Sequence, residues 1–166
     1  MRTEVGGREA GILLCPIERV HLPQVALLES LCFSEPWSER SLELLLGEEA
    51  LGAVLLVGDR VAAYGGMLLA PGEGQITNIA THPDFRRMGY GRAVLDALLS
   101  GARQKDCEQV ALEVRASNEG AIRMYEQAGF LTAGRRRGVY RNPTEDALVM
   151  LHGGILQLEN NGTCIF

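Results

Sequence analysis

The 166-residue sequence predicts one α/β domain built on a mixed sheet, with an antiparallel meander first, a parallel crossover after it and helices on both faces. Two observations lead to this fold class. Apolar runs flank the turn signal Gly58-Asp59-Arg60, which is typical of an antiparallel hairpin. From residue 92 onward, segments with helical spacing alternate with strand-like segments, and strand–helix–strand units of this length require parallel pairing.

The N-terminal half is predicted to supply the meander and two helices. Four strands are expected, each an apolar run bounded by turn residues. They cover residues 12–17, 53–57, 61–70 and 75–81. A helix is expected from Pro23 to Phe33, since proline suits a first helical turn and apolar residues follow at helical spacing. The segment Glu35-Pro36-Trp37 breaks this helix, and Ser38 can cap a second short one at 39–46.

The C-terminal half is predicted to hold the crossover. A loop of proline, glycine and arginine at 82–91 leads into a helix at 92–103, whose apolar residues share one side. The same alternation continues to the end of the domain. It predicts a strand at 109–114, a helix at 119–128 ended by Gly129, a strand from Phe130 onward and a last strand at 147–152.

Composition excludes several classes of protein. Hydrophobic residues make up 46% and charged residues 22%, which is ordinary for a soluble globular domain. The net charge of −5 argues against a general nucleic-acid binder and suits a basic partner. No apolar run is long enough to span a bilayer, and the polar segment 1–10 lacks a secretory signal, so a cytoplasmic protein without a membrane partner is expected. Four cysteines without metal-type spacing predict neither a zinc site nor a disulfide framework.

The segment 86–92 carries the first chemical signal. Two glycines and several arginines precede the strongest predicted helix, and a helix N-terminus offers backbone N–H groups and partial positive charge to an anion. A pyrophosphate would suit this arrangement. A solvent-facing glycine-rich turn is the competing interpretation. Neither a P-loop nor a Rossmann turn fits, because no Gly-Lys-Ser/Thr follows and seven residues separate the preceding strand from the first glycine.

Within this segment, Arg87-Met88-Gly89-Tyr90-Gly91 resembles the Arg/Gln-x-x-Gly-x-Gly/Ala signature of the GCN5-related N-acetyltransferases (GNAT). Further segments resemble one branch of that family, the RimI-type ribosomal-protein alanine N-acetyltransferases. They are residues 36–38, 78–83, 112–118, 121–130 and 145–147. The resemblance extends over about residues 12–151 and implies a GNAT-like mixed sheet.

The resemblance implies acetyl-CoA as cosubstrate and no metal. In this family the pantetheine arm pairs with the strand before the phosphate loop, so Ile79, Ala80 and Thr81 would offer backbone groups. Core packing is the alternative role for the first two side chains. Asn118 is implied as a further CoA contact and also suits a helix N-cap. The pyrophosphate contacts implied by the family are Arg87, Met88, Gly89, Tyr90, Gly91 and Arg92.

Two residues are implied as catalytic. Strand alternation places Ala111, Glu113 and Arg115 on one face, and by itself such a glutamate beside an arginine indicates a surface ion pair. The resemblance instead implies that Glu113 is the general base, acting through water. Tyr125 shares a helical face with apolar residues, so packing alone makes it a core tyrosine. The resemblance implies that Tyr125 is the general acid for the departing CoA thiolate.

Acceptor contacts are implied at Trp37 and Tyr140, which would border the peptide groove. An alternative for Trp37 is a hydrophobic plug between the first two helices. The run Arg135-Arg136-Arg137 is interpreted as a solvated strand end, and no direct nucleic-acid contact is expected. No predicted step needs a cysteine nucleophile, because neither Cys107 nor His82 has neighbours that suggest a catalytic pair.

These observations favour an acetyl-CoA-dependent enzyme that acetylates the N-terminal alanine of a small-subunit ribosomal protein by direct amine attack on the thioester. Two alternatives stay open: acetylation of a small-molecule amine or of several protein N-termini, and a non-catalytic acyl-CoA-binding module. The domain is expected at 11–152, after a flexible arm at 1–10 and before a tail at 153–166, where 155–158 could form an edge strand or contact another subunit. The sequence leaves the oligomeric state open.

Overall fold

The computed structural model describes residues 2–5, 8–153 and 165–166. Its strands are β1 (Arg2–Val5), β2 (Arg8–Pro16), β3 (Ala50–Val57), β4 (Arg60–Ala70), β5 (Glu73–Thr81), β6 (Gln109–Arg115), β7 (Leu131–Tyr140) and β8 (Glu145–Gly153). Its α-helices are α1 (Leu22–Cys32), α2 (Glu39–Leu42), α3 (Tyr90–Gln104) and α4 (Glu119–Gln127). Short 3-10 turns lie at Arg19–His21, Glu43–Leu46 and Pro83–Phe85.

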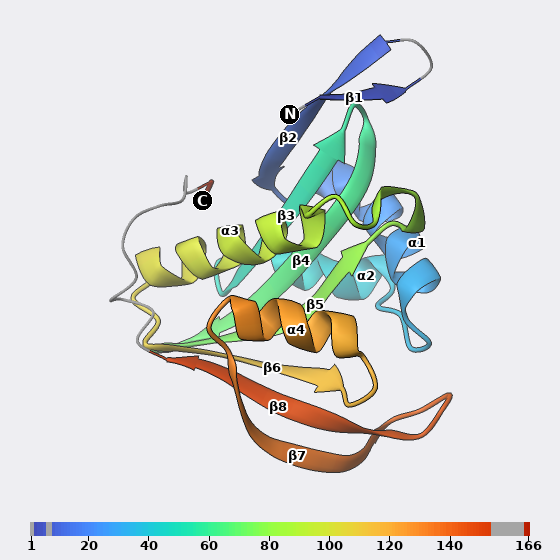
Figure 1. The fold of residues 1–166 in the computed structure, drawn as a ribbon. Helices are drawn as coiled ribbons and strands as arrows, with labels where there is room; N and C mark the ends of the chain where they lie inside the picture. The colour runs from blue at the N-terminus through green and yellow to red at the C-terminus, as the bar shows by residue number, and fades with distance from the viewer. Residues whose placement is uncertain (1, 6–7, 154–164) are drawn as a thin grey trace.

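The strands form one mixed sheet in the order β1-β2-β3-β4-β5-β6-β8-β7 (Figure 1). Strands β2 to β5 pair antiparallel in sequence order, as the predicted meander requires. Strand β6 returns parallel to β5 after α3, and β8 lies antiparallel between β6 and β7. The predicted fold class, a GNAT-like meander followed by a parallel crossover, is therefore confirmed.

The parallel pair is short, and this creates the cleft described below. Pairing between β5 and β6 runs from Glu73 with Gln109 to Gln75 with Ala111. Beyond these residues the two strands diverge, while β5 continues along β4 and β6 continues along β8. The β4–β5 register shifts between Gly65 and Met67, so β5 carries a bulge next to the point of divergence. Backbone groups on the facing edges of β5 and β6 are thereby available to a ligand.

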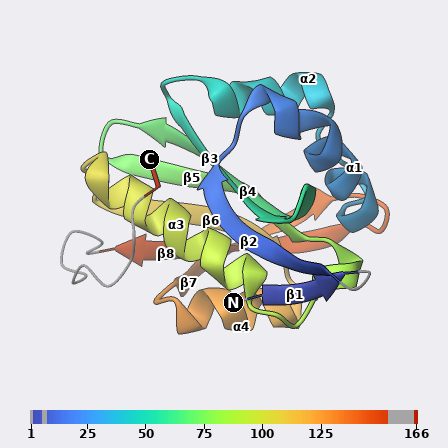
Figure 2. The ribbon, with the colours of Figure 1, turned by 90° about the horizontal axis from the view of Figure 1, so that it is seen from above.

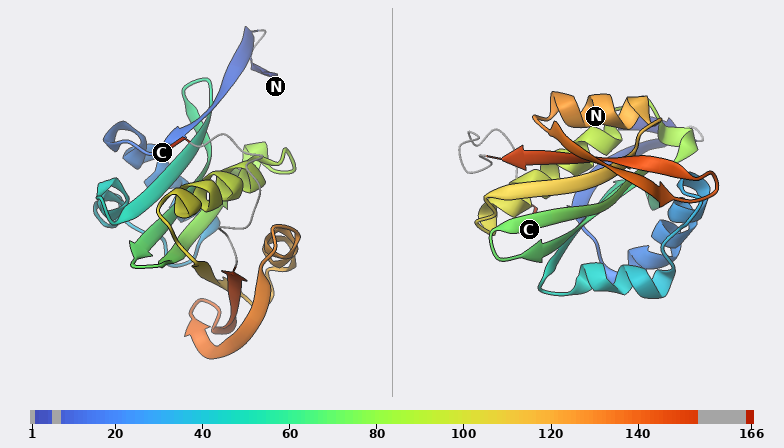
Figure 3. Two further views of the ribbon diagram at one scale, coloured as in Figure 1. Left: turned by 90° about the vertical axis from the view of Figure 1, so that its left-hand side faces the viewer. Right: turned by 90° about the horizontal axis from the view of Figure 1, so that it is seen from below.

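Helices cover both faces of the sheet, and each face has its own core (Figures 2 and 3). Helices α3 and α4 lie on one face, where Val94, Leu95 and Leu98 of α3 are completely buried. Helices α1 and α2 lie on the other face, where Val25 and Leu28 are buried against the sheet. In both cases the apolar side chains recur at helical spacing, which is why the sequence pattern located these helices.

Helix α3 begins two residues earlier than the sequence pattern indicated. Its N-cap is Gly89, which adopts φ of +78°, and the amide of Ala93 donates to the Gly89 carbonyl at 3.1 Å. Because glycine enters the left-handed region without strain, the chain can turn sharply here and start the helix at Tyr90. The two-glycine segment therefore belongs to the helix start rather than to the loop before it.

The two terminal segments are described in part. Within the predicted arm 1–10, Arg2–Val5 pairs antiparallel with Arg8–Gly11 as the start of the β1–β2 hairpin. The segment 155–158 lies outside the described residues. At the C-terminus, Ile165 and Phe166 pack against the core on the α3 side of the sheet.

Candidate active site

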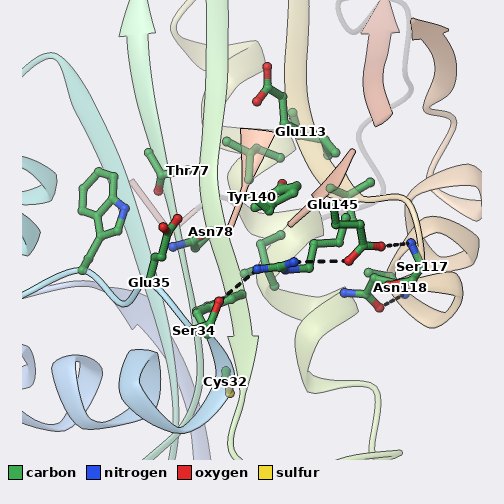
Figure 4. Close-up of a pocket in the computed structure, with 18 of the residues that line it drawn as sticks. Cys32, Ser34, Glu35, Thr77, Asn78, Glu113, Ser117, Asn118, Tyr140 and Glu145 are labelled. Carbon is green, nitrogen blue, oxygen red and sulfur yellow. Dashed lines mark hydrogen bonds and ion pairs between the residues drawn. The ribbon is translucent and has the colours of Figure 1, made fainter. Parts of the chain in front are cut away.

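A cleft of about 530 Å³ opens where β5 and β6 diverge (Figure 4). Its walls come from the α1–α2 loop, the second half of β5, the second half of β6, the start of α4 and the β7–β8 loop. Both predicted catalytic residues, Glu113 and Tyr125, line this cleft. So do the predicted acceptor contacts Trp37 and Tyr140, together with Asn118. Residues from five separate segments of the chain thus meet in one place.

Glu113 lies on β6 with its neighbours alternating between buried and half-exposed positions, as predicted for this strand. Its carboxylate forms an ion pair with Arg136 of β7, and the Glu113 side chain is 27% exposed. Residue spacing alone predicted an ion pair between Glu113 and the adjacent Arg115, and this prediction is wrong. Arg115 instead pairs with Glu145 at the start of β8, whereas Arg136 of β7, one strand further out, pairs with Glu113.

Tyr125 of α4 packs in the core and also reaches the cleft. The side chain is only 6% exposed and packs edge-on against Phe130, with 5.7 Å between ring centroids. The same residue forms part of the cleft wall. Burial raises the pKa of Tyr125 well above its usual range, and the nearby Tyr140 adds to this shift. The hydroxyl group is therefore a hydrogen-bond donor at any pH at which the protein would work.

The start of α4 is held by two carbonyl or carboxylate acceptors. Asn118 caps the helix, because its Oδ1 accepts from the Ala121 amide at 3.2 Å. Glu145 Oε1 accepts from the Ser117 amide at 2.6 Å (Figure 4). Hydrogen bonding from Ser117, with a contribution from Arg115, holds the pKa of the Glu145 carboxyl below its usual range. The predicted N-cap at Asn118 is confirmed, and the residue also faces the cleft.

Arg115 connects the two sides of the cleft. Its Nη1 donates to the Pro143 carbonyl at 3.0 Å and to Glu145 Oε2 at 3.2 Å. Its Nη2 donates to Ser34 Oγ at 2.9 Å and to the Arg141 carbonyl at 2.7 Å. One guanidinium thus joins the α1–α2 loop to the β7–β8 loop across the end of β6.

The two aromatic residues of the cleft are fixed by different contacts. The Tyr140 ring stacks against the Arg115 guanidinium, whose central carbon lies 4.6 Å from the ring centroid. Trp37 is half-buried and packs against the core on the α1 side while it also lines the cleft. Trp37 is therefore a packing residue that also forms part of the cleft wall, and its contact with an acceptor stays a prediction.

The predicted phosphate loop has little side-chain volume at its two glycines, Gly89 and Gly91. A Cβ at Gly89 would meet nothing within 4 Å, so the space in front of this left-handed residue is open. A Cβ at Gly91 would lie 3.1 Å from Thr81 Oγ1, so only a residue without a side chain fits comfortably there. Tyr90 is buried and packs beside Phe85. This cradle at a helix N-terminus fits a diphosphate.

The charged and apolar members of the loop differ in their surroundings. Arg92 Nε donates to Asp96 Oδ1 at 2.9 Å along α3, so its charge is partly compensated. Arg87 is exposed with φ of +63°, and Met88 is 43% exposed. Arg87 is therefore better placed than Arg92 to meet an added anion.

The strand before the loop has only part of its surface available. Ile79 lines the cleft, whereas Ala80 is buried in the core on the α1 side. The Thr81 carbonyl accepts from Cys32 Sγ and from Arg86 Nε, both at 3.5 Å. The side chains of Ile79 and Ala80 therefore both pack in the cores, and the pairing of their backbone groups with a cofactor stays a prediction.

Two residues that contact the cleft or its walls were missed by the sequence patterns. The multiple contacts of Arg115 join residues that lie 26 to 81 positions away, so no local motif could indicate them. Glu29 is completely buried in α1. Its position among the apolar residues of the predicted helix was a signal, because a carboxylate on an apolar helix face needs partners from elsewhere.

Residues 22–130 match the acetyltransferase (GNAT) family, and the chain belongs to this family. It is accordingly an acetyl-CoA-dependent acyltransferase, and the predicted resemblance is confirmed.

The most informative relatives share one description. A [ribosomal protein bS18]-alanine N-acetyltransferase from Escherichia coli K12 is 36% identical over 138 residues, covering 81% of this chain and 92% of the relative. A putative enzyme of the same description from Bacillus subtilis is 33% identical over 125 residues, covering 74% of this chain and 83% of the relative. The crystal structure of the E. coli ribosomal-protein-S18-alanine N-acetyltransferase superposes with a TM-score of 0.81 at 32% identity, covering 92% and 99% of the two chains.

Other features bear on partners of the protein. None of the helices in the described part of the chain is long and apolar enough to cross a membrane. Among residues 2–5, 8–153 and 165–166, no cluster of His, Cys, Asp and Glu side chains could hold a metal ion. Cys15, Cys32 and Cys107 are free thiols, and Cys164 lies outside the described residues.

Proposed function

We propose that the protein transfers the acetyl group of acetyl-CoA to the N-terminal alanine of a small-subunit ribosomal protein. The observation that carries this proposal is that Glu113 and Tyr125 line one cleft, at the divergence of β5 and β6. The chain is also 36% identical to an enzyme described as a [ribosomal protein bS18]-alanine N-acetyltransferase. The reaction needs only an amine nucleophile, a base, an acid and a held thioester.

In this proposal Glu113 is the general base, acting directly or through one water. The acceptor α-amine has a pKa near 8, so its deprotonation at pH 7 costs only ~1.4 kcal/mol. A lysine side chain with a pKa near 10.4 would cost ~4.6 kcal/mol under the same conditions. A carboxylate that is partly exposed and paired with Arg136 is a modest base, which suits an α-amine better than a lysine.

Tyr125 is proposed as the general acid. As the amine attacks the thioester carbonyl, the carbon–sulfur bond breaks and negative charge develops on the CoA sulfur. The Tyr125 hydroxyl donates a hydrogen bond to that sulfur and gives it a proton as the thiolate leaves, and solvent returns a proton to Tyr125. Glu113, directly or through one water, takes the proton that the attacking amine releases. Because burial raises the pKa of Tyr125, donation of the hydrogen bond is the larger part of its contribution.

Acetyl-CoA supplies the activated acetyl group, and three parts of the chain would hold it. Backbone groups of Ile79, Ala80 and Thr81 would pair with the pantetheine arm along the free edge of β5. The backbone of the loop 86–92 and the Arg87 side chain would hold the pyrophosphate. Asn118, at the start of α4, would contact the pantetheine arm from the opposite wall.

The acceptor is proposed to enter between the α1–α2 loop and the β7–β8 loop, with Trp37 and Tyr140 against its first residues. Glu35 stands at this entrance with its carboxylate unpaired among the described residues. Together with the net charge of −5, this favours a basic acceptor segment. We place the reaction in the cytoplasm, with neither nucleic acid nor membrane as a direct partner.

The decisive experiment compares acceptors under identical conditions. A peptide with the N-terminus of bS18 is expected to be acetylated on its α-amine, with mass spectrometry locating the added acetyl group. The same peptide with a blocked α-amine is the control and is expected to stay unmodified. Faster turnover of a small amine would favour a small-molecule acetyltransferase. Tight acetyl-CoA binding without turnover of any amine would favour a non-catalytic binding module.

A further inference from the structure

Glu29 of α1 is a buried carboxylate for which the mechanism above has no use. Its side chain is 0% exposed and lies in the core on the α1 side of the sheet, among residues such as Leu28 and Val25. Removing a carboxylate from water is unfavourable by several kcal/mol unless donors compensate it. A fully buried glutamate at the back of the cleft therefore needs a specific explanation.

Three donors converge on this carboxylate. Oε1 accepts from the Tyr64 hydroxyl of β4 and from Asn78 Nδ2 of β5, the latter at 2.8 Å. Oε2 accepts from the backbone amide of Trp37 at 3.2 Å. Burial, together with the Glu29 charge, raises the pKa of Tyr64 far above its usual range, so this hydroxyl remains a donor. All three partners donate, which is the pattern that an ionised carboxylate accepts.

Two of these donors belong to the cleft wall but come from different elements. Asn78 lies at the bulge of β5, where this strand leaves β6, and Figure 4 shows it in the wall of the cleft. Trp37 lies in the α1–α2 loop, at the proposed acceptor entrance. The two residues are 41 positions apart, and the two oxygens of one carboxylate connect them.

We infer that Glu29 is a positioning residue. Through the Trp37 amide it fixes the α1–α2 loop, which forms the acceptor side of the cleft, relative to the bulge of β5. The inference deepens the proposed function, because it assigns the α1–α2 loop to the acceptor. The interactions are also asymmetric: Oε1 serves the sheet, while Oε2 serves the loop alone. A substitution that changes only Oε2 therefore separates the two roles.

Glu29→Gln makes this separation. Glutamine keeps one oxygen, which can still accept from Tyr64 and Asn78, and it places an NH2 group against the Trp37 N–H. Two donors then face each other, and the loop loses its hydrogen bond to α1 while Ser34 keeps its contact with Arg115. The acceptor KM is expected to rise about tenfold, the size typical for a lost hydrogen bond to a charged group, while the acetyl-CoA KM stays within about twofold.

The chain carries its own probe for this effect, since Trp37 is its only tryptophan. In Glu29→Gln, acrylamide quenching of the fluorescence is expected to increase about twofold, because the released loop exposes the indole ring. A merely structural contact would lower the melting temperature without changing the quenching or the ratio of the two KM values. This measurement needs no acceptor, so it tests the inference even if the protein acetylates no peptide.

Gln24→Ala is the matched control on the same helix. Gln24 also ties α1 to the sheet, because its Oε1 accepts from the Val61 amide at 2.8 Å and its Nε2 donates to the Asp59 carbonyl at 2.9 Å. These contacts lie at the β3–β4 hairpin, away from the cleft. The control is expected to lower the melting temperature while both KM values and the quenching stay unchanged.

A double variant covers the case in which Glu29→Gln does not fold. Glu29→Met with Tyr64→Phe removes the carboxylate and the buried hydroxyl together, and apolar replacement of a buried polar pair is often neutral for stability. The same rise in acceptor KM and in quenching is expected. Parent-like quenching and a parent-like acceptor KM in a folded variant would overturn the inference. Failure of the proposed function alone would instead be seen as a parent protein that acetylates no ribosomal peptide.

Discussion

Replacing Arg115 by lysine would keep a positive charge at the end of β6 and remove the planar guanidinium group. The Nη atoms donate in two directions, with Glu145 on one side and Ser34 and the Arg141 carbonyl on the other. A single ammonium group cannot reach both sets of acceptors. The variant would therefore lose about half of these hydrogen bonds, together with the stacking contact to Tyr140.

The expected magnitude follows from the number and exposure of these contacts. The Arg115 side chain is 24% exposed, so each lost bond is worth about 1 kcal/mol rather than the larger value of a fully buried one. Two lost bonds lower the free energy of unfolding by about 2 kcal/mol, which for a chain of this size lowers Tm by about 4–8 °C. The acceptor KM is expected to rise as well, because Ser34 and Tyr140 stand at the cleft.

Thermal unfolding followed by circular dichroism, with steady-state kinetics in both substrates, measures these effects. Arg135→Lys is the matched control, because Arg135 of β7 makes a more exposed ion pair with Asp146 of β8. This pair is worth at most about 1 kcal/mol. The acetyl-CoA KM is expected to be unchanged in both variants. An Arg115→Lys protein with the Tm and acceptor KM of the parent would show that the guanidinium does not hold the two loops together.

Four further substitutions test the other assignments. Glu113→Gln and Tyr125→Phe are each expected to lower kcat by about 10²–10⁴-fold while calorimetry shows unchanged acetyl-CoA affinity; loss of that affinity would contradict catalytic roles. Gly89→Ala is expected to weaken acetyl-CoA binding about tenfold, because the added Cβ fills the space in front of the loop and strains its left-handed backbone. Gly72→Ala, at φ of +76° in the β4–β5 turn, is the control: it carries the same backbone strain and should leave acetyl-CoA binding unchanged. The lowered pKa of Glu145 contributes stability that is present above about pH 4.5 and is lost as the pH falls through the folded-state value. Glu145→Gln should therefore flatten the acid limb of a plot of Tm against pH. An acid limb identical to that of the parent would contradict this expectation.

Most elements of the fold could be predicted because their signals are local. The apolar side of α3 and the alternation along β6 are periodic patterns within one segment, and both appear in the structure as predicted. The start of α3 was placed two residues late, because a left-handed glycine N-cap has no counterpart in the apolar pattern. The divergence of β5 from β6 could be inferred only by resemblance, since pairing between strands has no local signature.

The site shows the same division. Gly89 and Gly91 mark the cradle at the start of α3 within a few residues, and resemblance was enough to single out Glu113 and Tyr125. The partners of these residues could not be predicted in the same way. Arg136 lies 23 positions from Glu113 and was interpreted as part of a solvated strand end.

The order of residues in the chain thus specifies the helices, the strands, the glycine cradle and the family, because periodicity and short motifs act within a few residues of one another. The pairing of Glu113 with Arg136, the multiple contacts of Arg115 and the buried interactions of Glu29 depend on the folded arrangement. Apart from the Glu29–Trp37 hydrogen bond, which spans 8 positions, these contacts join different elements over 23 to 81 positions of sequence. Such contacts form only after the sheet has brought those elements together, because no local sequence pattern specifies which distant side chains will face one another.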